Sequence, residues 1–82
     1  MIKHWTTVLH VDDLVKLAEL EQVCKDISAR DQSFHYSVNP KTKKILIYSD
    51  SRDLAHRRGM WFHHKFGLFY DVYFMAAKFG EE

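Results

Sequence analysis

The hydrophobic residues of this chain change their spacing along the sequence, from every second position to every third or fourth and back again. Residues 2–11 alternate between apolar and polar sides, which is typical of a half-buried strand. Residues 14–27 then repeat at helical spacing, and Asp12 and Asp13 before them supply an N-cap and negative charge for the first turn. We therefore expect a strand followed by a helix that ends near Arg30.

A hairpin is predicted next. Two short β-favourable runs, 33–38 and 43–48, flank the sequence Asn-Pro-Lys-Thr at 39–42, in which proline fits the first central position of a type I turn. If Val38 faces Lys43 across this loop, one face of the hairpin is apolar and belongs to the core. The expected pairs on that face are Tyr36 with Ile45 and Phe34 with Ile47.

A second helix is expected to begin near Asp50, with Asp53 three residues later in an arrangement similar to a capping box. Gly67 is well placed to end it in a left-handed conformation. Gly59 inside this helix costs about 1 kcal/mol relative to alanine unless it permits close packing. The expected buried stripe consists of Leu54, Ala55, Trp61, Phe62 and Phe66.

The last apolar segment, residues 68–79, alternates and is rich in Phe, Tyr and Val, so we expect a strand. The competing interpretation is a third helix with Val72, Met75, Ala76 and Phe79 on one face. With a final strand, the order β-α-β-β-α-β predicts a ferredoxin-like α+β fold. Its four-stranded antiparallel sheet carries both helices on one face, in a single domain spanning residues 1–82.

The composition of the chain bears on its cellular location and on its distribution of charge. The 82 residues include one cysteine, so no internal disulfide can form, and a reducing, cytoplasmic location is expected. No signal peptide is recognisable, and the longest apolar stretch is far shorter than the roughly 20 residues of a membrane span. The formal net charge is only +1, but residues 11–31 hold six acidic and three basic side chains, whereas residues 41–67 hold seven basic and two acidic ones.

In this fold the sheet face away from the helices must meet water, a ligand or another protein. By alternation, this face is expected to hold His4, Thr6, Val8, His10, His35, Ser37, Lys44, Leu46, Tyr48, Phe69, Tyr73 and Met75. Aromatic, apolar and histidine side chains are unusually common among them for a face that meets only solvent, which indicates an interface.

The second predicted helix carries the most unusual stretch of the chain, a basic and histidine-rich run at 56–65. Arg57 and Arg58 could bind a phosphate or a carboxylate, and the alternative is a solvated basic face with no ligand. Together with the open sheet face, this run defines our candidate partner-binding residues: His4, His10, His35, Lys44, Tyr48, Arg57, Arg58, His64, Phe69 and Tyr73.

Metal binding and catalysis have little support in the sequence. His56, Met60 and His64 form a line at helical spacing, but the zinc spacing of two histidines four residues apart is absent. No local spacing places Cys24 beside a histidine, and Asp12 and Asp13 are better explained as a helix cap than as acid-base partners of a histidine. We therefore expect no metal, no cofactor, no small-molecule substrate and no enzymatic activity.

The leading hypothesis is a small interaction module, of the inhibitor or adaptor type, that docks on another protein through the open sheet face and the basic helix. The partner could also be a second copy of the chain, because pairing of open faces would stabilise a small domain. The alternative is binding of single-stranded RNA or DNA by the same surface, through stacked aromatic rings and basic side chains. The run at 43–48 lacks the aromatic and glycine signature of RNA-recognition strands.

Overall fold

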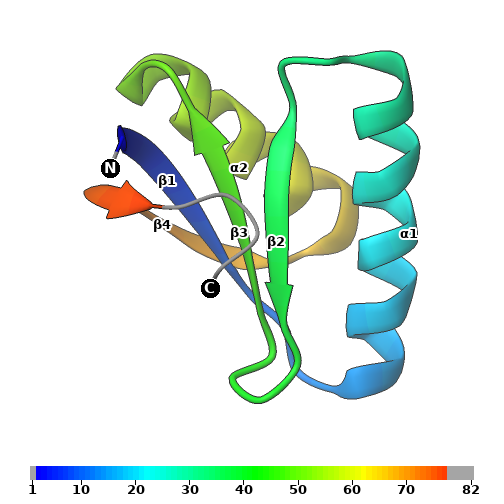
Figure 1. Cartoon of the computed structure of the whole chain (residues 1–82). Coiled ribbons are helices and arrows are strands. Elements are labelled where there is room, and N and C mark those ends of the chain that lie inside the picture. Colours follow the sequence, from blue (N-terminus) through cyan, green and yellow to red (C-terminus); the bar gives the residue numbers. More distant parts are fainter. Residues whose placement is uncertain (1, 78–82) are drawn as a thin grey trace.

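The chain folds in the order β-α-β-β-α-β, and the computed structural model describes residues 2–77, with side-chain surroundings for residues 5–74. The strands form one antiparallel sheet in the order β2-β3-β1-β4, and both helices cover the same face of it (Figure 1). The elements are β1 (Ile2–His10), α1 (Leu14–Arg30), β2 (His35–Asn39), β3 (Lys44–Ser49), α2 (Arg52–Phe66) and β4 (Phe69–Ala77). The predicted ferredoxin-like arrangement is confirmed, and the last segment is a strand rather than a third helix. Residues 78 and 79, also assigned to that strand from the sequence, lie outside the described residues.

Both helices begin at a side-chain cap. The Asp13 carboxylate accepts a hydrogen bond of 2.8 Å from a backbone N–H in the first turn of α1, as predicted. In α2 the cap is Ser51 rather than Asp50, because Ser51 has the extended backbone and its Oγ accepts from the N–H of Leu54 at 3.2 Å. Gly67 ends α2 with a φ of 71°, the left-handed conformation that favours glycine.

The β2–β3 hairpin has a different register from the expected one, with Tyr36 opposite Ile47 rather than Ile45. The turn explains this difference. The Asn39 side chain accepts hydrogen bonds of 3.1 and 3.4 Å from two backbone N–H groups of the turn, and Lys43 adopts a φ of 56°, so Lys43 belongs to the turn and not to β3. Because the shift is two residues, every side chain keeps its predicted face of the sheet.

The core lies between the sheet and the helices. The buried Thr7 hydroxyl donates a hydrogen bond of 2.7 Å to the carbonyl of Ala55, which joins β1 to α2. The apolar core cluster consists of Leu9, Val11, Leu17, Leu20, Cys24, Phe34, Ile45, Ile47, Phe62 and Leu68.

Gly59 allows α2 to approach β4 closely. A Cβ atom at this position would overlap the ring of Tyr70, whose Cγ lies only 2.8 Å from where it would stand. The cost of a glycine within a helix is therefore offset by the packing of an aromatic ring against bare backbone. The sequence predicted a cost for Gly59 unless it permits close packing, and the structure shows that close packing.

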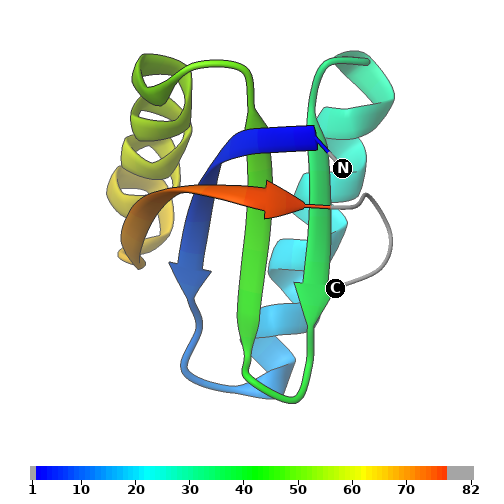
Figure 2. The same cartoon turned by 60° about the vertical axis from the view of Figure 1, so that its left-hand side comes forward.

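The sheet is strongly bent, because β1 and β4 continue past the end of β3. β3 pairs with β1 only from Trp5 onward, so residues 2–4 of β1 pair with β4 alone. A two-stranded ribbon twists more than a wider sheet. In Figure 2 this ribbon crosses in front of β3 and β2, on the side away from the helices. The sheet face that the helices leave uncovered is therefore concave.

Candidate functional site

Seven of the ten predicted partner-binding residues belong by strand register to the sheet face away from the helices, and all of these but His4 lie where side-chain surroundings are described. The strand registers align this face in three rows: Asn39, Lys44, His10 and Phe69; then Ser37, Leu46, Val8 and Asp71; then His35, Tyr48, Thr6 and Tyr73. Every residue expected on this face between positions 6 and 73 falls in one of these rows. His4 pairs with Met75 beyond the third row, and the surroundings of these two side chains lie outside the described part of the chain.

The centre of this face is buried, which is a correction to its predicted openness. Thr6, Val8 and Tyr48 have exposed fractions of 0%, 6% and 2%. The Tyr48 hydroxyl is hydrogen-bonded to the Ser37 hydroxyl at 2.9 Å. Tyr48 therefore supports the sheet from within and does not present its ring to a partner. Alternation predicts which face a residue lies on, but it does not reveal that the face is concave.

The accessible part of the same face lies along β4. Phe69 is 76% exposed and Tyr73 is 51% exposed. Between them, the Asp71 carboxylate accepts a hydrogen bond from His10 Nε2 at 2.8 Å, which becomes an ion pair when the histidine is protonated. Since β4 is an outer strand of the sheet, these residues stand at a border where the described structure has no neighbouring strand.

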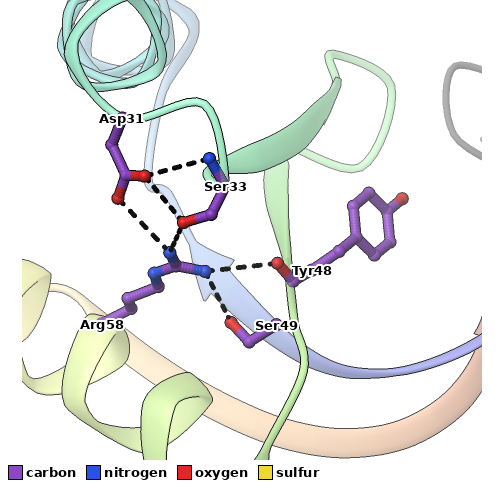
Figure 3. Close-up of polar contacts among 5 residues, drawn as sticks. All are labelled: Asp31, Ser33, Tyr48, Ser49 and Arg58. Carbon is purple, nitrogen blue, oxygen red and sulfur yellow. Dashed lines mark hydrogen bonds and ion pairs between the residues drawn. The ribbon is translucent and has the colours of Figure 1, made fainter.

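The two adjacent arginines of α2 have different surroundings. Arg57 is exposed, and its Nε lies 3.0 Å from a carboxylate oxygen of Asp53, one turn earlier in α2. Arg58 points toward the sheet, where its guanidinium donates hydrogen bonds to the Tyr48 carbonyl at 3.3 Å and to Ser49 Oγ at 3.0 Å (Figure 3). Arg58 is therefore a structural residue, which removes it from the predicted contact surface.

The Asp31 carboxylate completes this polar network. It accepts hydrogen bonds from the Ser33 hydroxyl at 2.7 Å and the Ser33 backbone N–H at 3.0 Å, and it lies 3.7 Å from the Arg58 guanidinium (Figure 3). These hydrogen bonds, with a smaller contribution from the charge of Arg58, hold the pKa of Asp31 below its usual value. The guanidinium also lies over the Phe34 ring, 5.1 Å from its centre. The network thus joins the end of α1, the segment before β2, the end of β3 and the middle of α2.

A surface groove of about 410 Å³ lies along the contact between α2 and the start of β4. Hydrogen bonds orient two of its histidines: the Tyr70 hydroxyl is 3.0 Å from His56 Nδ1, and His63 Nδ1 donates to the Leu68 carbonyl at 2.8 Å. The groove is lined by His56, Met60, His63, His64, Phe69 and Tyr70. Because Phe69 belongs both to this groove and to the sheet face, the exposed surfaces of α2 and β4 meet there.

Sequence reasoning missed the exposure of Met60 and misplaced Trp61. Trp61 was expected in the buried stripe of α2, but it is 42% exposed, with its ring edge-on to Phe62 and 5.4 Å from Lys65 Nζ. The residues of α2 that are buried are Ala55, Gly59 and Phe62. These three residues, spaced four and three positions apart, form a narrower buried stripe than the one expected from hydrophobicity. Gly59 was missed because glycine has no hydrophobic side chain that would mark the position as buried.

The predicted basic region does not form one surface. Lys41, Lys43 and Lys44 lie at or beside the β2–β3 turn, whereas Arg52 and Arg57 lie in the first half of α2. Figure 1 shows this turn and the start of α2 at opposite ends of β3. Of these cations, only Lys44 shares a row of the sheet with an exposed aromatic residue, Phe69.

The candidate metal and nucleophile positions have plain structural explanations. Within the described residues, no group of three or more His, Cys, Asp or Glu side chains could hold a metal ion. His64 is exposed, with its ring 5.4 Å from that of His63. Cys24 is fully buried, and burial raises its pKa to about 12, so at neutral pH it is a protonated thiol packed as a small hydrophobe.

No helix in residues 2–77 is long and apolar enough to cross a membrane. Comparison with known proteins gives no further guide, since no protein-family model, curated protein or solved structure matches this chain.

Proposed function

We propose that this chain is a small protein-binding module, acting by docking rather than catalysis, whose contact surface is the exposed side of β4. One observation carries the proposal: Phe69 and Tyr73 are both more than half exposed and stand four residues apart on one face of an outer strand. Aromatic residues are enriched at protein interfaces and supply much of their binding energy. Two of them on the border of a sheet form a ready contact surface.

The surroundings of these rings fit the centre of an interface. Asp71, the charged residue between them, accepts a hydrogen bond from His10 of the same chain, so its carboxylate already has a partner within the fold. Charged residues are depleted at interface centres, and a charge that is buried there needs such a partner. Met60 and His64 extend the surface across the groove onto α2. A cytoplasmic setting belongs to this proposal, because the single cysteine is a buried thiol without an internal disulfide partner.

Binding of single-stranded RNA or DNA, the alternative from the sequence, has weaker support. Such binding needs cationic side chains along the path of the backbone beside the stacking rings. Here Arg58 is held inside the fold and Arg57 is paired with Asp53. In the row of Phe69, the only basic side chains are those of Lys44 and His10.

The test is to immobilise the chain and expose it to nuclease-treated cell lysate, using the wild type and two double variants. We expect Phe69→Ala/Tyr73→Ala to lose the retained protein and Arg52→Ala/Arg57→Ala, the matched change on exposed cations, to keep it. Both pairs are exposed, so each variant should retain wild-type stability to within about 1 kcal/mol. Thermal unfolding followed by circular dichroism checks this.

A fluorescent single-stranded RNA of mixed sequence provides the second arm. Loss of RNA binding in the arginine variant, with affinity that falls steeply as salt is added, would favour nucleic acid as the partner. Protein retention that is unchanged by Phe69→Ala/Tyr73→Ala would contradict the proposal.

A further inference from the structure

We infer that the partner of β4 is a second copy of this chain, paired antiparallel along the outer edge of β4, where the described residues place no neighbouring strand. Two four-stranded sheets would then join into one continuous sheet across a two-fold axis. This inference rests on the proposed use of β4 as a docking strand and names what it docks with.

The two outer strands of the sheet differ in how they are protected. β2 has five residues, carries polar side chains at His35, Ser37 and Asn39, and is followed by Pro40. Short, polar outer strands that end at proline are a usual protection against pairing with another chain. β2 is therefore poorly suited to accept a further strand.

β4 lacks such protection. It has nine residues without lysine, arginine, proline or glycine, and its one charged side chain, Asp71, is bound to His10 of its own chain. A long apolar outer strand exposes a row of backbone N–H and C=O groups that can pair with another strand. Phe69, Tyr73 and Phe74 add exposed aromatic surface, with 76%, 51% and 53% of each residue accessible. These features are typical of an outer strand that pairs with a strand of another chain.

The sequence of β4 is complementary to itself when it runs antiparallel about its central residue, Tyr73. In this register all nine residues pair, and Phe69 and Tyr70 of one copy lie opposite the two alanines at the end of the other. Val72 then lies opposite Phe74, Tyr73 lies opposite its own copy, and Asp71 lies opposite a methionine. Aromatic pairs and aromatic–β-branched pairs across strands are favourable, whereas like charges directly opposite each other are not.

Other antiparallel registers pair fewer residues of β4 or place like charges opposite each other. An axis through Asp71 would bring two carboxylates face to face and leave the last four residues of the strand without a partner residue in β4. An axis through Val72 would leave the last two residues of the strand without a partner residue in β4. Only the axis through Tyr73 uses the whole strand, which is why we assign this register.

The test uses charge at the axis. Sedimentation velocity over a concentration series should show the wild type approaching twice its monomer mass of 9.8 kDa. Tyr73→Lys and Tyr73→Glu each place like charges opposite each other, so each alone should weaken dimerisation about tenfold or more. An equal mixture of the two variants should restore a dimer. Val15→Lys, at a residue that is 73% exposed on α1, is the matched control and should leave the dimer intact.

The possible outcomes separate the two proposals. A wild type that stays monomeric, or a dimer that is indifferent to charge at Tyr73, overturns the self-pairing. If such a chain still retains another protein from lysate through Phe69 and Tyr73, the protein-binding proposal stands and its partner is a different chain. If a Tyr73 variant fails to fold, amide hydrogen exchange of the wild type decides instead: residues 69–77 should gain protection as the protein concentration rises, and no gain there overturns the self-pairing.

Discussion

Gly59 sets the distance between α2 and β4, and this small residue shows how much of the packing depends on single positions. The Tyr70 ring occupies the space that any side chain at position 59 would need, and its hydroxyl is hydrogen-bonded to His56. Glycine within a helix is a recognisable signal in the sequence, but its neighbour, eleven residues away along the chain, is not. The need for close packing could be predicted, whereas the residue that requires it could not.

We expect Gly59→Ala to destabilise the fold. Alanine gains about 1 kcal/mol in helix propensity, but overlap with the Tyr70 ring costs about 1–3 kcal/mol. The net loss should appear as a lower urea midpoint. In a Tyr70→Ala background the same substitution should be neutral or stabilising, because the overlapping ring is gone. A lower midpoint of equal size in both backgrounds would show that Tyr70 is not the cause.

Among the elements, α2 is held in place by Arg58 as well as by its apolar contacts. The guanidinium joins α2 to the end of β3 and to the residues before β2 (Figure 3). Helical spacing places Arg58, three residues after Ala55 and four before Phe62, beside the buried side of α2, and it turns Arg57 about 100° away. The polar groups that hold the Arg58 guanidinium lie far along the chain. The side of the helix was therefore predictable, whereas the partners of Arg58 were not.

We expect Arg58→Ala to lower the free energy of unfolding by about 1.5–3 kcal/mol, because it removes charge-assisted hydrogen bonds and leaves the buried Ser49 hydroxyl without its donor. Arg57→Ala is the matched control and should change it by no more than about 1 kcal/mol, since its ion pair is exposed. Urea unfolding of both variants measures the difference. Equal effects would contradict the structural role of Arg58.

At the scale of the whole molecule, the order of elements was predictable because the hydrophobic spacing changes clearly at each boundary. The faces of the strands were predictable for the same reason, and the hairpin kept them even though its register differs by two residues. The bend of the sheet was not predictable, because it arises where β1 and β4 outrun β3, which is a matter of relative strand length. This bend buries Tyr48 and leaves Phe69 and Tyr73 at the accessible border.

The central claim is that β4 is the docking strand, and that a second copy covers its outer edge. Amide hydrogen exchange followed by mass spectrometry, at increasing protein concentration, tests this most directly. We expect protection of peptides that contain residues 69–77 to rise with concentration, while peptides that contain residues 35–39 of the opposite edge stay unchanged. Protection that rises at residues 35–39 instead, or at neither edge, would contradict the account.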